Sequence, residues 1–408
     1  MKPAGGESAR PATTGAAPVV FVANDPWASQ WRRKQQLASR LAARRRVYYL
    51  DPPFSPLDFA RGTRSPGEWL RSPYRCRADA SGVRVVRGAW GIPAERFSAL
   101  VELANAVRQR AWARSCLDRL AREEGLEEAV LICYAPLLHP LAPPLRVRRL
   151  VYDAIDDYAL LSRARRLGGR IDARMKALAA AADLTLVPDE NLRARLRPFA
   201  RRIVKLPHGV DTRAFRPDAW RGTRFADLRQ SPGVKAVFHG TLNERLDQSL
   251  LLALLRAGVT LLLAGESTWP RRGVAELRAA GDLRLFGLLP QGDAGALVAS
   301  ADVGIIPYRP LPGVSSLDNL KAAEFLAAGL PVVASGDPQA RASPRGGRGG
   351  IRDAPRGGIT LAAGPEAFVR AVREAGAGGA SPGKPPIESR DAVSWEARVR
   401  ELEALLES

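Results

Sequence analysis

Several kinds of residue or segment are scarce in this chain of 408 residues, and each scarcity narrows the protein classes to consider. The three cysteines, Cys76, Cys116 and Cys133, show neither metal-site nor disulfide spacing, which predicts a reducing compartment such as the cytoplasm. No run of eighteen apolar residues exists, because an arginine interrupts the most apolar segment, 250–264. Residues 1–16 are small and polar and lack an apolar signal core, so we expect a disordered leader and no export.

Lysine is also scarce, yet the chain is strongly basic. The formal net charge is +20, and only 7 of the 62 basic residues are lysine. The first 250 residues hold 44 basic and 25 acidic residues, whereas the remainder is nearly balanced. A basic surface attracts acidic substrates or an anionic membrane surface, although an arginine-rich coding bias would give the same charge without a function. No nucleic-acid motif accompanies the charge, so we expect no nucleic-acid partner.

Short apolar runs alternate with helical segments along most of the chain, which predicts α/β architecture with parallel sheets. The pattern indicates an N-terminal doubly wound domain over 17–212 and a second one over 235–390, separated by a link containing Pro and Gly. A terminal helix over 391–408 is expected to pack back towards the N-terminal domain. Two such domains with a cleft between them suit a ligand that bridges both.

The segment 315–335 carries the clearest chemistry. It predicts a polar turn, a helix over 318–328 and a buried strand after Pro331. Lys321 and Glu324 are three residues apart and project from one face near the helix N-terminus, where free N–H groups favour anions. A lysine there suits phosphate, and a glutamate one turn on suits ribose hydroxyls, so the pair indicates a nucleotide site. A solvated ion pair is the alternative interpretation.

A second candidate loop follows the predicted strand 236–239. His239, Gly240 and Thr241 come at the strand end, where ligands meet open α/β sheets. Gly240 would allow close backbone approach to phosphate, and Arg245 lies just beyond it, where it can neutralise a pyrophosphate. A tight turn with a solvated arginine would fit the same residues.

The first domain offers candidates for binding a second substrate, the acceptor, whose hydroxyl group would react. Asp153, Asp156 and Asp157 follow a predicted strand, and a carboxylate there can take a proton from an acceptor hydroxyl. Asp157 is our candidate base, because Asp156 suits a helix cap and Asp153 stays close to the strand. His139 is a candidate for lining the acceptor side. No D-x-D pair and no His/Cys cluster occurs, so we expect no catalytic metal.

These segments together resemble a known family. The pattern E-x-x-A-x-G-x-P-V-V, here over 324–333, resembles the donor-site helix of GT-B glycosyltransferases, in particular the bacterial group 1 or family 4 enzymes. Further similar fragments are LVYDAIDDY at 150–158, LPHGVD at 206–211, VFHGTLNERLD at 237–247 and ADVGIIPY at 301–308. The pattern is also similar to that of transferases of teichuronic acid and exopolysaccharide biosynthesis.

The resemblance implies a GT-B fold, in which two Rossmann-like domains face each other across a cleft. It implies a metal-independent transfer of a sugar from a nucleotide diphosphate to a hydroxyl of a glycan, lipid-linked or small-molecule acceptor, with no cofactor. The expected location is the cytoplasm, with a peripheral position at the inner face of the cell membrane as the alternative. The donor-binding residues would be Gly240, Arg245, Pro307, Tyr308, Ser316, Asn319, Lys321 and Glu324, and the acceptor side would hold Trp27, His139 and Asp156.

One departure from the family pattern keeps alternatives open. Many members that retain anomeric configuration have a second glutamate eight residues before Glu324, where this chain has Ser316. Sugar, nucleotide, acceptor and stereochemical outcome therefore stay undetermined. A sugar-nucleotide epimerase with a similar fold, or a non-catalytic protein that binds sugar nucleotides or a membrane surface, remains a rival interpretation.

Overall fold

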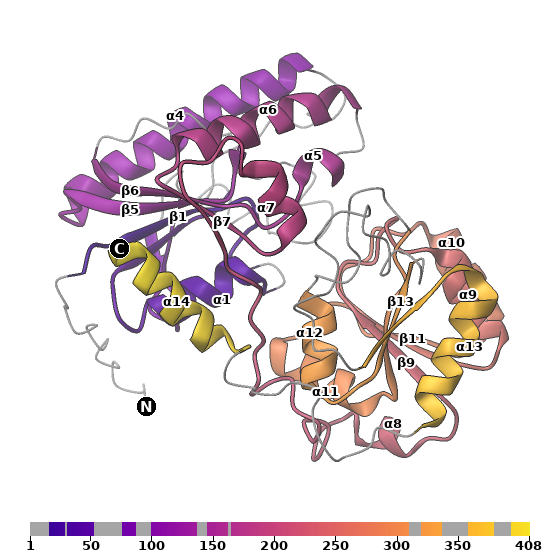
Figure 1. Ribbon diagram of the computed structural model, residues 1–408. Coiled ribbons are helices and arrows are strands. Elements are labelled where there is room, and N and C mark those ends of the chain that lie inside the picture. Colours follow the sequence, from indigo (N-terminus) through magenta and orange to yellow (C-terminus); the bar gives the residue numbers. More distant parts are fainter. Residues whose placement is uncertain are drawn as a thin grey trace. The chain divides into compact units, whose positions relative to one another are not determined.

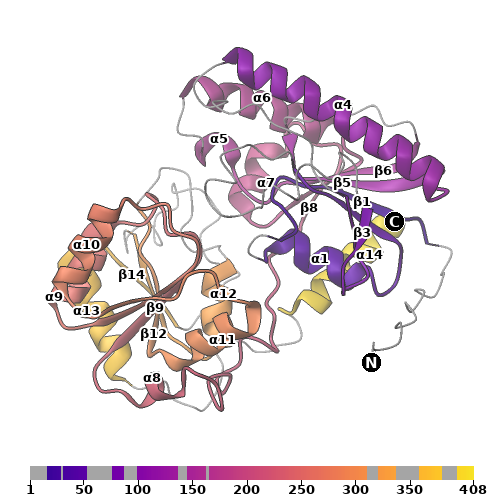
Figure 2. The same ribbon diagram turned by 180° about the vertical axis from the view of Figure 1, so that it is seen from behind.

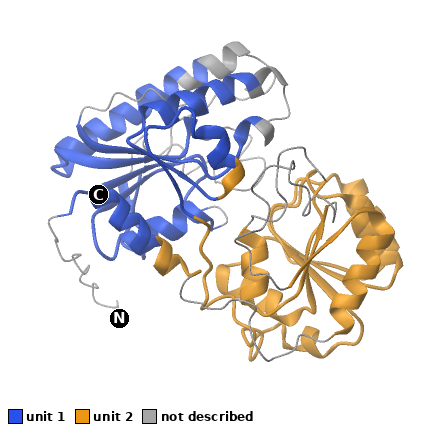
Figure 3. Cartoon of the chain, in the orientation of Figure 1, with its two compact units in different colours: residues 1–188, 192–206, 399–408 blue, residues 189–191, 207–398 orange. Residues whose placement is uncertain are grey.

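The computed structural model describes residues 16–28, 31–52, 76–86, 99–136, 145–161, 165–309, 320–336, 358–378 and 393–408. Its described residues form two compact units (Figure 3). Unit 1 comprises residues 1–188, 192–206 and 399–408, and unit 2 comprises residues 189–191 and 207–398. The predicted leader over 1–16 and the predicted site residues His139, Ser316 and Asn319 lie outside the described residues, apart from residue 16 itself.

Unit 1 contains an eight-stranded sheet with the order β3-β4-β2-β1-β5-β6-β7-β8. All neighbours pair in parallel except β3 and β4, which are antiparallel. The chain moves outward from β1 in one direction and then returns to β5 beside β1, which makes the sheet doubly wound. The strands are β1 (Val19–Val22), β2 (Val47–Leu50), β3 (Cys76–Ala78), β4 (Arg84–Val86), β5 (Glu128–Cys133), β6 (Arg146–Asp153), β7 (Leu184–Val187) and β8 (Ile203–Lys205).

Helices cover both faces of this sheet (Figure 1). The long helices α4 and α6 lie on one face, and α1 and α14 lie on the other. Buried residues of α4, α6 and α7, among them Leu117, Met175 and Leu192, form the core on the first face. The helices are α1 (Arg33–Leu41), α4 (Ala99–Glu123), α5 (Tyr158–Leu161), α6 (Arg165–Ala181), α7 (Glu190–Leu196) and α14 (Trp395–Glu407).

Helix α14 begins in unit 2 and ends in unit 1. In unit 1 its Glu403 pairs with Arg44 at 2.5 Å, and Glu407 pairs with Arg45 at 3.3 Å. At its other end, Trp395 packs on Gly209, where an added Cβ would lie 2.7 Å from the indole. The predicted helix over 391–408 thus corresponds to an element anchored at both ends.

Unit 2 contains a six-stranded sheet with the order β11-β10-β9-β12-β13-β14. Every pair in it is parallel, and the winding direction reverses between β9 and β12. The strands are β9 (Lys235–His239), β10 (Thr260–Ala264), β11 (Leu283–Leu285), β12 (Val303–Ile306), β13 (Val332–Ser335) and β14 (Ile359–Ala362). These two parallel sheets confirm the predicted α/β class and its Rossmann-like winding.

Two helical layers sandwich the sheet of unit 2 (Figure 2). Helices α9, α10 and α13 lie on one face, and α8, α11 and α12 lie on the other. Successive strand residues point to opposite layers: Val237 joins the core beneath α11 and α12, whereas Phe238 joins the core beneath α9 and α13. The helices are α8 (Ala226–Gln230), α9 (Gln248–Arg256), α10 (Arg271–Ala280), α11 (Gln291–Ser300), α12 (Leu320–Ala327) and α13 (Gly364–Ala377).

The segment predicted as an interdomain link is part of unit 2. Phe215, Phe225 and Leu228 are buried in its core, and α8 lies within this segment. Pro and Gly residues suggested a linker, but three large apolar residues at irregular spacing find partners only in the tertiary structure. Strand β14 was likewise not predicted, because its four residues follow a stretch rich in Gly and Arg.

Among the helices of the described ranges, none combines the length and the apolar character that a bilayer-spanning segment needs.

Candidate functional site

The candidate site in unit 2 lies where the winding of its sheet reverses. The carboxyl ends of the adjacent parallel strands β9 and β12 meet there. His239 ends β9 and Gly240 follows it, while Pro307 and Tyr308 follow β12. Reversal points of this kind leave a crevice between diverging loops, and ligands of open α/β sheets bind there.

Two glycines allow the backbone to cross closely at this edge. Gly240 has φ +141°, and Gly265 has φ +137°, both in the region that favours glycine. A Cβ on Gly265 would lie 1.9 Å from the Gly240 carbonyl oxygen. The Gly240 N–H donates to the Ala264 carbonyl at 2.8 Å, so β10 fixes the turn that follows β9.

The loop after Gly240 is fastened to the segment after β12. The Asp247 N–H donates to the Pro307 carbonyl at 2.8 Å, and the Arg309 N–H donates to the Arg245 carbonyl at 2.7 Å. These bonds place the Arg245 guanidinium carbon 4.9 Å from the centre of the Tyr308 ring. An arginine stacked on an aromatic face keeps its N–H groups at the rim available to an anion.

Lys321, on the first turn of α12 that the structure describes, reaches across to the same place. Its Nζ lies 6.0 Å from the centre of the Tyr308 ring and 5.6 Å from that of Phe238. A Cβ on Gly240 would approach the Lys321 Cε to 2.4 Å and its Nζ to 3.0 Å. The absence of a side chain at Gly240 is therefore what lets the lysine lie over the backbone at the strand end.

Lys321 and Arg245 thus converge on Tyr308 from two elements. Neither forms an ion pair with an acidic side chain within the described ranges, and the Arg245 Nε is buried without a hydrogen-bond partner there. Two cations beside a glycine turn form a local positive region that would attract an anion. A diphosphate fits this arrangement, because its charge is spread over several oxygens that two separate cations can contact.

Glu324 lies one helical turn beyond Lys321 and is only 2% exposed. Its Oε2 is 2.8 Å from the Nε2 of His239, whose side chain is also buried. His239 stacks on Phe215, with ring centres 5.4 Å apart, and meets the edge of Phe325 at 5.7 Å. Lys321 and Glu324 lie on the side of α12 that faces the strand ends, as their i, i+3 spacing allows. The spacing gave no indication that His239 contacts Glu324.

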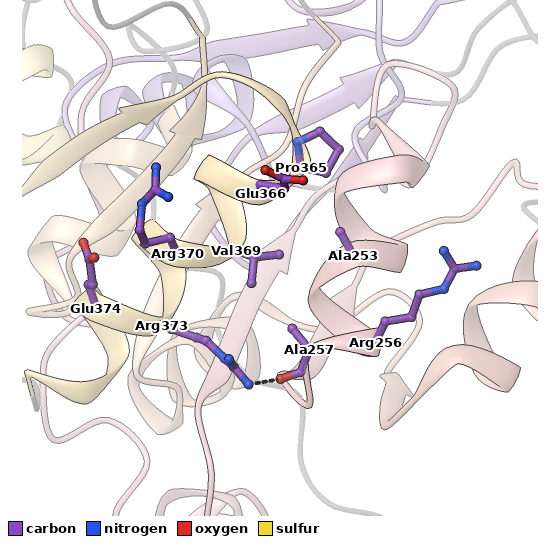
Figure 4. A pocket seen from close by; sticks show the side chains of 9 residues that line it. All are labelled: Ala253, Arg256, Ala257, Pro365, Glu366, Val369, Arg370, Arg373 and Glu374. Carbon is purple, nitrogen blue, oxygen red and sulfur yellow. Dashed lines mark hydrogen bonds between the residues drawn. The ribbon is translucent and has the colours of Figure 1, made fainter.

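A groove of unit 2 lies between α9 and α13 (Figure 4). Its volume is about 570 Å³, and its lining side chains come from both helices: Ala253, Arg256, Ala257, Pro365, Glu366, Val369, Arg370, Arg373 and Glu374. Arg373 donates to the Ala257 carbonyl and so satisfies the C-terminal end of α9. The groove lies between two helices, and none of the strand-end residues described above lines it.

In unit 1, polar residues gather at the carboxyl ends of β1 and β6. The fully buried Lys34 on α1 donates to Asn24 at 2.5 Å and pairs with Asp25. Asn24 in turn donates to the Tyr158 hydroxyl at 2.7 Å. Burial lowers the pKa of Lys34, although Asp25 opposes that shift. The network fixes the conformation of the loop after β1 at the carboxyl edge of the sheet.

The predicted acceptor-side residues have distinct environments in unit 1. Trp27 is 8% exposed, packs edge-on against Tyr49 at 5.1 Å, and donates its backbone N–H to Asp51 at 2.7 Å. Asp156 is exposed, whereas Asp157 forms an ion pair with Arg195 of α7. Asp153, the last residue of β6, is fully buried and accepts from Arg33 at 2.8 Å.

Our sequence analysis assigned no role to four residues of these two sites: His239, Asn24, Asp25 and Lys34. A signal for Asn24 and Asp25 existed, since two polar residues directly follow a buried strand. Lys34 gave no signal, because a lysine in the first turn of a helix normally points into solvent. His239 was visible only as the polar end of an apolar strand.

Across the described ranges, no group of three or more His, Cys, Asp or Glu side chains is placed to hold a metal ion. The three cysteines are free; burial raises the pKa of Cys116 to about 12 and that of Cys133 to about 11. Metal independence of any reaction stays a prediction.

No protein-family model and no curated protein sequence matches this chain. Solved structures do match it. Sucrose-phosphate synthase from Thermosynechococcus elongatus has a TM-score of 0.68 at 16% identity, over 96% of this chain and 98% of that one. HepE from Anabaena, solved with UDP and glucose, gives 0.60 at 13%, over 96% and 100%. WaaG, a glycosyltransferase involved in lipopolysaccharide biosynthesis, gives 0.55 at 17%, over 95% of each chain.

The chain has the GT-B fold. This confirms the fold that the sequence resemblance implied. At such low identities the likeness establishes the architecture, while substrates and residue roles have to be argued from the chain itself.

Proposed function

We propose that this protein is a glycosyltransferase that takes a sugar from a nucleotide diphosphate and transfers it to a hydroxyl group. The observation that carries the proposal is the convergence of Lys321 and Arg245 on Tyr308 beside Gly240, at the reversal point of the unit 2 sheet. HepE from Anabaena, which has a similar structure and was solved in complex with UDP and glucose, supports a nucleotide-sugar donor.

The geometry suggests how the chain would promote the reaction. Breaking the sugar–phosphate bond leaves a diphosphate that gains negative charge in the transition state. Lys321 lies over Gly240 and Arg245 stacks on Tyr308, so both cations would stabilise that charge with little reorganisation. Glu324 would accept hydrogen bonds from ribose hydroxyls, and the fixed loop 241–247 would orient the donor.

A binding screen tests this function directly. Thermal shift and calorimetry with UDP, GDP, ADP and dTDP, and with their sugar conjugates, should identify one base that binds more tightly than the others. Incubation of that sugar nucleotide with candidate acceptors should then give a glycosylated product. Failure of all four diphosphates to bind would overturn the proposal. Epimerisation in the absence of an acceptor would favour the epimerase alternative, and binding without any turnover would favour a binding protein.

We propose Asp157 as the base that receives the acceptor proton. Its carboxylate follows β6 at the carboxyl edge of the unit 1 sheet and forms an ion pair with Arg195 of α7. Asp157→Asn is expected to lower turnover about a hundredfold while leaving nucleotide affinity intact. Turnover near that of wild type, together with a lower melting temperature, would assign Asp157 to the ion pair with α7 and would point to a retaining mechanism without a base.

Chelation provides a separate test. Because two fixed cations face the leaving diphosphate, we expect turnover to survive EDTA. Rates with EDTA, and with added Mg²⁺ or Mn²⁺, should agree within about twofold when charge stabilisation by protein groups suffices. Loss of turnover in EDTA and its recovery with either metal would contradict this expectation.

We propose that the basic charge of the first 250 residues directs the protein to a lipid-linked or otherwise anionic acceptor at a membrane surface. Each basic residue near an anionic surface contributes about 1 kcal/mol, and salt screens the attraction. Sedimentation with vesicles should therefore be stronger for anionic than for neutral lipid and should decline as salt increases. Equal sedimentation with anionic and neutral vesicles would contradict this proposal and would attribute the charge to an arginine-rich coding bias.

A further inference from the structure

His239 stands out because its surroundings are otherwise apolar. It ends β9 and points to the same layer as Val237, a core formed by Phe215, Phe325 and residues of α11 and α12. Burying an imidazole and a carboxylate together costs desolvation energy, and a well-packed apolar pair of similar volume would stabilise such a core at least as well. The His239–Glu324 contact therefore calls for an explanation beyond stability.

The two side chains lie close together without forming a regular hydrogen bond. Nε2 of His239 and Oε2 of Glu324 are 2.8 Å apart, with side-chain exposures of 8% and 3%. The approach falls outside ordinary hydrogen-bond geometry, and neither atom has another hydrogen-bond partner among the described residues. Polar contacts in ligand sites are often misaligned without the ligand and tighten when it binds.

Packing restricts what either side chain can do. The imidazole is stacked on the fully buried Phe215 and bounded by the edge of Phe325, so it has little freedom to rotate away. Glu324 sits on α12 one turn after Lys321, whose Nζ marks the expected phosphate position. An imidazole that holds one carboxylate oxygen leaves the other oxygen free to receive hydroxyl groups.

We propose that His239 is a positioning residue for nucleotide recognition: it orients the Glu324 carboxylate towards the ribose hydroxyls and thereby makes the site select ribonucleotides over 2′-deoxyribonucleotides. The inference rests on the proposed nucleotide-sugar function. To that function the inference adds a source of selectivity for the ribose of the nucleotide. This source is a residue of β9 that acts through Glu324.

The test compares matched diphosphates in wild type and variants. UDP and 2′-deoxy-UDP, GDP and 2′-deoxy-GDP, and ADP and 2′-deoxy-ADP are titrated by calorimetry, and the pair with the tightest-binding base is used. Wild type should prefer the ribose form about tenfold or more, because a site that hydrogen-bonds a hydroxyl through a charged group loses that bond in the deoxy form. His239→Phe keeps an aromatic ring beside Phe215 and removes Nε2, so the preference should fall to within about twofold.

Three further measurements separate positioning from a structural role. His239→Gln restores an amide N–H and should recover part of the ribose preference. Inorganic pyrophosphate, which has no ribose, should bind wild type and His239→Phe equally. Phe368→Leu on α13 alters another fully buried ring of unit 2 and should lower the melting temperature without changing the ribose preference.

The outcomes distinguish the two proposals. If no diphosphate binds wild type, the proposed function fails and this inference fails with it. If diphosphates bind wild type with a ribose preference that His239→Phe retains, the positioning role of His239 is overturned and the function stands. Should His239→Phe fail to fold, His239→Gln decides: a ribose preference below that of wild type with unchanged pyrophosphate affinity supports the inference, and a preference equal to that of wild type overturns it.

Discussion

Replacing Lys321 with alanine is expected to weaken nucleoside diphosphate binding about 10- to 100-fold and to lower turnover about 100- to 1,000-fold. The loss of one charge-assisted contact corresponds to about 1.5–3 kcal/mol in binding. The effect on turnover is larger, since the ammonium group would meet most negative charge when the diphosphate departs. Lys321 is only partly buried and lies over Gly240, so its removal opens space at the surface and should scarcely change the melting temperature.

A matched control for charge is available on α13. Arg370 is an exposed cation of unit 2 that lines the α9–α13 groove. Arg370→Ala lowers the net charge by the same amount and should leave both affinity and turnover unchanged. Titration with nucleoside monophosphate and diphosphate refines the result, because the gain from the second phosphate should shrink in Lys321→Ala. Equal affinities in the two variants would remove Lys321 from the donor site.

The positions of Lys321 and Gly240 could be anticipated because they depend on local rules. A glycine directly after a strand lies at the carboxyl edge of a parallel sheet. A lysine in the first turn of the helix that follows a strand lies at the same edge. The order of the strands, which put β9 beside β12, brought the two together. Winding of α/β units follows few topologies, so this much could be predicted from the alternation of elements.

What the sequence left open depends on partners distant in the chain. Glu324 and His239 are separated by 85 positions, and nothing in the local pattern of either announces a buried contact. Lys34 shows the same limit: its helix begins with four buried polar residues, a pattern opposite to that of a solvent-facing first turn. Such burial arises from the loop after β1, which supplies Asn24, from Tyr134 directly after β5, and from Tyr158 at the start of α5.

Asp153→Ala should destabilise unit 1 by about 3–5 kcal/mol, the cost of leaving a buried charge without its partner. Arg33 is 1% exposed and Asp153 is fully buried, and the Arg33 Nε donates to the Asp153 Oδ2 at 2.8 Å. Because the chain has two units, a single transition is not assumed. Hydrogen exchange of β5 and β6 amides, followed with urea, should report the loss in unit 1.

An exposed pair provides the comparison for Asp153→Ala. Glu123 and Arg119 of α4 are 3.1 Å apart, but their side chains are 51% and 43% exposed. Glu123→Ala should cost at most about 0.5 kcal/mol, since water screens the pair and solvates the arginine that remains. Similar losses in the two variants would contradict the argument that burial, rather than pairing alone, sets the energy.

A double replacement separates the charge from the contacts that Arg33 makes. Arg33→Met with Asp153→Leu removes both charges and should recover much of the stability that Asp153→Ala loses. Recovery should stay incomplete, because Arg33 also donates from Nη1 to the Leu206 carbonyl at 2.8 Å, and losing a buried donor costs about 1–3 kcal/mol. Leu206 is the last residue of unit 1 before the chain enters unit 2 at Pro207. If the double variant is no more stable than Asp153→Ala, the bond to Leu206, and not the uncompensated charge, is what unit 1 requires of Arg33.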